Sequence, residues 1–128
     1  MVKHDRSDRV RRGYLNHRTG EAAEDRIASA YGEQGFAVIH RRWRGAAGEI
    51  DLILRGPDGL IFAEVKQSRD FAHAAASLGP KQMQRIYSAA EEFLATEPSG
   101  QNSEARFDVA LVDTMGRFQI IENAFGQV

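Results

Sequence analysis

The chain contains no cysteine, which excludes a disulfide framework and any thiolate metal site. No apolar stretch approaches the roughly 20 residues that span a bilayer, and residues 1–18 lack the apolar run of a signal peptide. The formal net charge of −1 excludes a uniformly basic coat for nucleic acid. We therefore expect a cytoplasmic protein with no membrane segment, in which local charge patches matter more than the total.

The 128 residues, of which 42% are hydrophobic, suffice for one compact domain with a real core. Residues 1–18 carry six arginines and lysines against two aspartates, and they include few large apolar residues. We predict a basic, mobile N-terminal arm over residues 1–18 and a single domain over residues 19–128. The arm is either a solvated terminus or a segment that touches nucleic acid.

Hydrophobic periodicity predicts an α/β domain. One helix is expected to begin at Thr19 and to end before Gly35, and a second and clearer helix opens at Gly79-Pro80. Strands are expected over residues 36–40, 49–54, 60–66, 106–112 and 117–122. The order α-β-β-β-α-β-β argues for a central mixed β-sheet of about five strands flanked by helices.

The sequence GEIDLILRGPDGLIFAEVK, residues 48–66, predicts a hairpin that carries a charge cluster. A four-residue turn at 56–59 sets Asp51 across from Glu64. It also sets Glu49 across from Lys66, so all four charged side chains share one face. A tighter turn would set Asp51 against Lys66 and keep the same face. Directly opposed carboxylates are destabilising unless something offsets their charge, and a divalent cation would do so.

Two carboxylates and a lysine on one face are the parts of a metal-dependent site that cleaves phosphodiester bonds. Their hard oxygen ligands suit Mg²⁺ or Mn²⁺, which can polarise a phosphate and lower the pKa of a bound water. The lysine can orient that water or stabilise charge on the phosphate. On spacing alone, the same hairpin also fits a half-solvated surface with cross-strand ion pairs.

Two further features remain open from the residues alone. The densest basic and aromatic patch is formed by Arg41, Arg42, Trp43 and Arg44. It suits phosphate contact and base stacking. Alternatively, it is an edge strand whose charges prevent pairing with another chain, with Trp43 packed on its surface. Glu24 lies beside the apolar stripe of the first helix, and its spacing favours a helix-edge position over one directed inward.

The GEID motif followed by Glu64-Val65-Lys66 resembles the core of the PD-(D/E)XK nuclease superfamily, which includes restriction endonuclease-like and Holliday junction resolvase-like proteins. Residues 20–125 resemble, more closely, the bacterial YraN-like family of uncharacterised proteins. The matching positions are Gly20, Glu24, Gly35, GEIDLI at 48–53, residues 62–66, Lys81, residues 89–90 and 93–94, RFDV at 106–109, and NAF at 123–125.

This resemblance implies a restriction endonuclease-like core and specific site residues. Carried over by position, the expected catalytic residues are Glu24, Asp51, Glu64 and Lys66. The expected ligands of Mg²⁺ or Mn²⁺ are Asp51, Glu64 and the backbone carbonyl of Val65. Nucleic acid is expected to bind at Arg41, Arg42, Trp43, Arg44, Arg69 and Lys81.

We therefore expect a magnesium-dependent nuclease that acts on DNA more readily than on RNA. The resemblance to junction-resolving proteins suggests branched DNA, and a chain of this size is expected to need a homodimer to cover a symmetric junction. The first alternative is a non-catalytic nucleic-acid-binding module that keeps the fold. The second is a structural protein in which the charge cluster is a solvated ion-pair network.

Overall fold

The computed structural model describes residues 6–100 and 104–124, with side chains described from residue 20 onward. In chain order the elements are α1 (Arg6–Glu33), β1 (Ala37–Arg44), β2 (Glu49–Gly56), β3 (Gly59–Gln67), α2 (Phe71–Ala76), α3 (Pro80–Leu94), β4 (Ala105–Val112) and β5 (Phe118–Ile121). The strands form one sheet in the order β1-β2-β3-β4-β5, in which β3 and β4 are parallel and the other pairs antiparallel. The predicted mixed sheet of five strands is confirmed.

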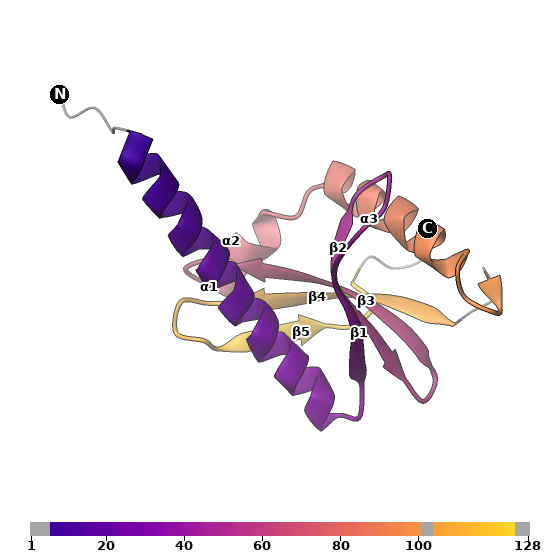
Figure 1. Ribbon diagram of the computed structural model, residues 1–128. Helices are drawn as coiled ribbons and strands as arrows, with labels where there is room; N and C mark the ends of the chain where they lie inside the picture. Colours follow the sequence, from indigo (N-terminus) through magenta and orange to yellow (C-terminus); the bar gives the residue numbers. More distant parts are fainter. Residues whose placement is uncertain (1–5, 101–103, 125–128) are drawn as a thin grey trace.

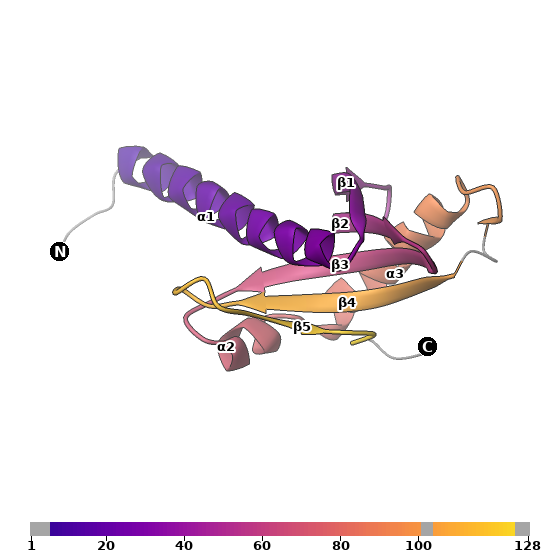
Figure 2. The same cartoon turned by 90° about the horizontal axis from the view of Figure 1, so that it is seen from below.

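The sheet is the middle of three layers (Figures 1 and 2). On one face, the apolar stripe of α1 packs on the central strands through Ala23, Ile27, Tyr31, Leu52, Leu54, Ile61, Ala63, Ala110 and Val112. On the other face, α3 packs through Ile86, Ala89, Ala90, Phe93 and Leu94 on Ile50, Ile53, Leu60 and Phe62. The short α2 covers the same face beside β4. Within the described residues, no helix combines the length and apolar character needed to cross a bilayer.

The first helix begins earlier than the sequence predicts. It includes Arg6, so Thr19 lies inside α1 and is not its N-cap. Residues 6–18 contain no proline and one glycine, so nothing in them breaks the helix. The mobility of residues 1–18 stays a prediction, and residues 1–5 lie outside the described part. The helix ends where predicted, because Gly35 has a φ of 91° and closes it in a left-handed conformation.

The β2–β3 hairpin adopts the first of the two predicted registers, but its pairing is shorter than predicted. Arg55 pairs with Leu60 as expected, and the ladder continues as far as Leu52 opposite Ala63. It stops there, so the expected pair of Asp51 and Glu64 is not part of the ladder. The regular pairing of β2 with β3 therefore ends before Asp51.

The alternation of β2 also breaks at this point. Strict alternation would place Ile50, Leu52 and Leu54 on one face of the strand. Leu52 and Leu54 do share the α1 side of the sheet, but Ile50 packs on the α3 side. On its other side β2 stays paired with β1, where Arg41 pairs with Leu52 and Trp43 with Ile50. Between these pairs Arg42 has a φ of 51°, so the regular alternation is interrupted at this point. The divergence opens a space between β2 and β3 at the end that carries the acidic residues.

A buried polar network ties α1 to β4. The carboxylate of Asp108 is fully buried and accepts a hydrogen bond from the Tyr31 hydroxyl at 2.7 Å. It also contacts Arg106 through two guanidinium nitrogens, and it accepts a hydrogen bond from the backbone N–H of Asn123 at 3.0 Å. Burial and the neighbouring Asp108 raise the pKa of Tyr31, so its hydroxyl remains a donor at neutral pH. This network fixes the first helix over the sheet.

Removing the hydroxyl of Tyr31 tests this anchor. We expect Tyr31→Phe to lower the free energy of unfolding by about 1–3 kcal/mol, because it leaves a buried carboxylate with one donor fewer. The measurement is urea denaturation followed by circular dichroism. Met115→Ala is the control, since Met115 is exposed and should change stability by less than about 0.5 kcal/mol. Equal midpoints for the wild type and Tyr31→Phe would contradict the prediction.

Candidate functional site

A cavity of about 340 Å³ lies where β2 and β3 diverge. Its walls are Gly20, Ala23 and Glu24 from α1, Glu49 and Asp51 from β2, Glu64, Val65, Lys66 and Gln67 from β3, and Gln82 from α3. The structure thus brings all four residues expected to be catalytic to one cavity. Glu24 is buried, so the helix-edge position that its spacing favoured is wrong.

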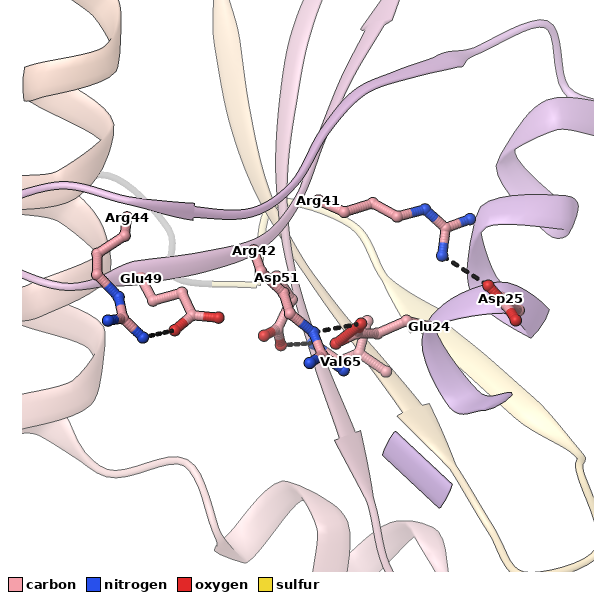
Figure 3. A network of polar contacts seen from close by, with 8 residues as sticks. All are labelled: Glu24, Asp25, Arg41, Arg42, Arg44, Glu49, Asp51 and Val65. Atoms are coloured by element: carbon pink, nitrogen blue, oxygen red, sulfur yellow. Dashed lines mark hydrogen bonds and ion pairs between the residues drawn. The ribbon is translucent and has the colours of Figure 1, made fainter. Parts of the chain in front are cut away.

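Asp51 links the two strands after their ladder has ended. The backbone N–H of Val65 donates to Asp51 Oδ2 at 2.8 Å, so a side chain accepts a bond that strand pairing no longer provides (Figure 3). This bond holds the carboxylate against β3 and satisfies a half-buried backbone donor. The role of the Val65 carbonyl as a metal ligand stays a prediction.

Glu64 is the most perturbed acid of the cavity. Only 6% of the residue is exposed, and burial is the main cause that raises its pKa well above its usual value. A hydrogen bond with Asp51 and the charge of Asp51 raise the pKa further, while the charge of Lys66 lowers it. Without a cation, the burial of Glu64 and its contact with Asp51 therefore disfavour the state in which both carboxylates are ionised.

Gln82 is a cavity residue that the sequence did not reveal. Its Nε2 lies 3.5 Å from Glu64 Oε2, at the limit of a hydrogen bond. Lys81 was predicted as the site residue of α3, but its side chain is exposed and is not among those that line the cavity. Lys81 was expected from the family resemblance, and no motif or spacing in the sequence pointed to Gln82.

The pair of Asp51 and Glu64 fits a hard divalent cation. Two carboxylates in contact, of which Glu64 is buried and Asp51 half-buried, repel each other when both are ionised, and a dication can offset their charge as a proton does. Among the described residues, no group of three or more histidine or acidic side chains is arranged to hold a metal together. Asp51 and Glu64 would thus hold the ion with water completing its shell, as is usual for Mg²⁺.

The arginines of β1 are distributed among carboxylates. Arg41 meets Asp25 at 2.6 Å, Arg42 meets Glu24 at 3.1 Å and Arg44 meets Glu49 at 3.3 Å (Figure 3). The strand was expected to end at residue 40, but it continues to Arg44 and forms the edge of the sheet. The patch is therefore not one continuous basic surface, because two of its arginines reach carboxylates of the cavity wall.

The remaining residues expected to bind nucleic acid lie away from the cavity wall. Trp43 packs edge-on against Phe93 with ring centroids 5.5 Å apart, which is the packed arrangement that the sequence left open. Arg69 follows β3 and contacts the imidazole of His73 at the start of α2. Nucleic-acid contact by these side chains stays a prediction.

Two larger hollows lie at the opposite end of β3, near the hairpin turn. Their volumes are about 450 Å³ and 520 Å³, and both are lined by Gly59, Leu60 and Glu104. Neither contains a pair of buried carboxylates. The chemistry of the walls therefore marks the smaller cavity as the candidate site.

The chain belongs to the uncharacterised protein family UPF0102, whose model matches residues 23–112. A UPF0102 protein of Ruegeria pomeroyi is 59% identical over 90% of this chain and 94% of its own length. Another, from Cereibacter sphaeroides, is 58% identical over 88% of this chain and 97% of its own length. The expected family membership is confirmed, and the matched segment contains the acidic residues of the cavity.

A comparison of structures gives a repair endonuclease from Pyrococcus abyssi. The match covers 91% of this chain and 42% of that chain, with a TM-score of 0.42 and 20% sequence identity. The chain therefore spans less than half the length of that endonuclease.

The raised pKa of Glu64 predicts a pH-dependent stability. The folded state keeps a proton that the unfolded state releases above pH 4.5, the ordinary value. Because the unfolded state then binds fewer protons, the free energy of unfolding should fall as the pH rises from 4.5 to the raised pKa of Glu64, about 10. Glu64→Gln cannot titrate and should reduce this slope. Urea denaturation in EDTA at several pH values measures it, and equal slopes for both proteins would contradict the assignment.

Proposed function

We propose that the protein is a metal-dependent nuclease that hydrolyses phosphodiester bonds, in DNA more readily than in RNA. The observation that carries the proposal is the contact between the half-buried Asp51 and the buried Glu64, with Lys66 on the same cavity wall. Keeping two carboxylates together where one of them is buried is costly, and a metal site is the function that makes use of both.

Each residue has a distinct role in this proposal. Asp51 and Glu64 hold Mg²⁺ or Mn²⁺, which when bound polarises the phosphate and lowers the pKa of a water. The Val65 N–H fixes Asp51 in the required orientation. Lys66 is the cation placed to stabilise charge on the phosphate or to orient the attacking water. Gln82 contacts Glu64 from α3 and limits its rotation.

A non-catalytic nucleic-acid-binding module is the second candidate. It is favoured by the ion pair between Arg42 and Glu24, which gives one cavity carboxylate a counter-ion from the chain itself. In that case the cavity needs no metal to balance Glu24. The two candidates differ in what Asp51 contributes, because a module that only binds phosphate gains nothing from an acidic residue.

Substitution of Asp51 separates the candidates. We expect the wild type to cleave at least one member of a panel of single-stranded, duplex, flap and four-way-junction DNA and RNA in Mg²⁺ or Mn²⁺. Asp51→Asn should reduce the rate on the order of 100-fold or more, because it removes the charge that holds the cation. Gel electrophoresis of end-labelled substrates measures both the rate and the position of the cut.

Asp25→Asn is the matched control, because Asp25 neighbours Glu24 on α1 but is exposed and lies outside the cavity. It should cleave at the wild-type rate. Binding without cleavage, unaffected by metal and not weakened by Asp51→Asn, would overturn the nuclease proposal in favour of the binding module. The same panel also identifies the substrate, and sedimentation of the complex on junction DNA tests the expected homodimer.

A further inference from the structure

Arg42 has an unusual backbone for a residue in a strand. Its φ of 51° lies in the left-handed region, which costs a residue with a Cβ about 1–2 kcal/mol. Consecutive side chains of a regular strand point to opposite faces. Here both Arg41 and Arg42 reach α1, where they contact Asp25 and Glu24 (Figure 3). The left-handed residue allows this, and it turns Arg42 toward the acidic cavity.

The ion pair between Arg42 and Glu24 is less exposed to solvent than the neighbouring pair of Arg41 and Asp25. The Nε atom of Arg42 lies 3.1 Å from Glu24 Oε1, and the two side chains are 32% and 10% exposed. The values for Arg41 and Asp25 are 46% and 68%. Burial is the main cause that raises the pKa of Glu24 and the charge of Asp51 raises it further, while the hydrogen bond from Arg42 opposes this shift. The ion pair thus gives a buried carboxylate of α1 a counter-ion from β1.

The cavity is short of positive charge for a substrate that carries phosphates. Of the described residues that line it, four are acidic and one is basic: Glu24, Glu49, Asp51 and Glu64 against Lys66. A nucleic acid that enters must meet further cations or be repelled. Ion pairs hold two arginines at the wall of this cavity, Arg42 at Glu24 and Arg44 at Glu49. Arg42 is the more enclosed of the two, with 32% of its side chain exposed against 79% for Arg44.

We propose that Glu24 is a positioning residue, which holds the Arg42 guanidinium beside Asp51 and Glu64 so that Arg42 contacts a phosphate of the bound nucleic acid. The inference rests on the proposed function, and it assigns Glu24 a role other than that of a metal ligand. The absence of a three-residue metal-binding group among the described side chains agrees with this. A guanidinium suits the task, because its fork of five donors can serve a carboxylate and a phosphate together.

Binding of fluorescein-labelled four-way-junction DNA, followed by fluorescence anisotropy, tests the proposal. All variants carry Asp51→Asn so that cleavage does not interfere. We expect Glu24→Ala to weaken binding about tenfold, and to reduce the slope of log Kd against log salt by about one, the loss of one phosphate contact. Removal of a negative charge would by itself tighten binding, so a weaker complex reports the positioning role.

Two variants control for charge and for folding. Asp25→Ala removes the neighbouring, exposed carboxylate and should bind the junction at least as tightly as the parent. Glu24→Gln keeps an oxygen acceptor for Arg42 and should restore most of the affinity lost in Glu24→Ala. Such rescue by the conservative variant distinguishes positioning from a purely structural role, and circular dichroism confirms that each variant is folded.

Substitution of Arg42 completes a double-mutant cycle. Arg42→Gln keeps an N–H donor for Glu24 but removes the charge, and it should weaken binding as much as Glu24→Ala does. The double variant should be no weaker than Arg42→Gln, because the two residues act through one contact. Arg55→Ala removes a cation that pairs with Glu97 near the opposite end of β2, and it should change affinity by less than about twofold.

Metal binding gives an independent measurement. In the chain that retains Asp51, calorimetric titration with Mn²⁺ should give Glu24→Ala an affinity within about threefold of the wild type. A loss of tenfold or more would make Glu24 a metal ligand and overturn the proposal, as would tighter DNA binding by Glu24→Ala or additive effects in the cycle. Absence of cleavage by the wild type would instead overturn the nuclease function, and the DNA-binding cycle would still decide the role of Glu24.

Discussion

The separation of β2 from β3 at Asp51 is the constraint on which the rest of the site depends. Where β2 and β3 are paired, their backbone N–H and C=O groups bond to each other and their apolar side chains pack in the core. Once they part, the N–H of Val65 needs a new acceptor and the carboxylate of Asp51 supplies it. The bond that repairs the end of the ladder therefore also fixes one acid at the mouth of the cavity, opposite Glu64.

Electrostatics then decides what this cavity can bind. The burial of Glu64 and its contact with Asp51 disfavour a state in which both carboxylates are charged without a cation. The edge strand β1 balances Glu24 and Glu49 through Arg42 and Arg44. Asp51 and Glu64 have no such arginine in the described ion pairs, and Lys66 is the one basic residue among those that line the cavity. The negative charge that Lys66 does not balance is left to a proton or a metal. The arginines of β1, which the sequence suggested as a nucleic-acid surface, thus form ion pairs with carboxylates of the protein itself.

Much of the fold could be predicted from the sequence because each element has a regular period. The stripe of Ala23, Ile27 and Tyr31 fixes the face of the first helix, and the hairpin turn fixes the register of Arg55 and Leu60. The predictions failed where the structure departs from regularity. These places are the early start of α1, the face on which Ile50 lies, and the end of the β2–β3 ladder at Leu52. Local patterns describe regular structure, whereas these departures depend on how neighbouring elements pack.

The site shows the same division. Asp51, Glu64 and Lys66 were readable from alternation along a single hairpin. The inward position of Glu24 contradicted its spacing, because its burial depends on tertiary contacts, among them the ion pair with Arg42 of β1. Gln82 and the left-handed backbone of Arg42 had no local signal at all. Periodicity therefore cannot identify residues whose role comes from a contact between distant segments. In this protein the same residues surround the two repelling carboxylates and hold them in a defined arrangement.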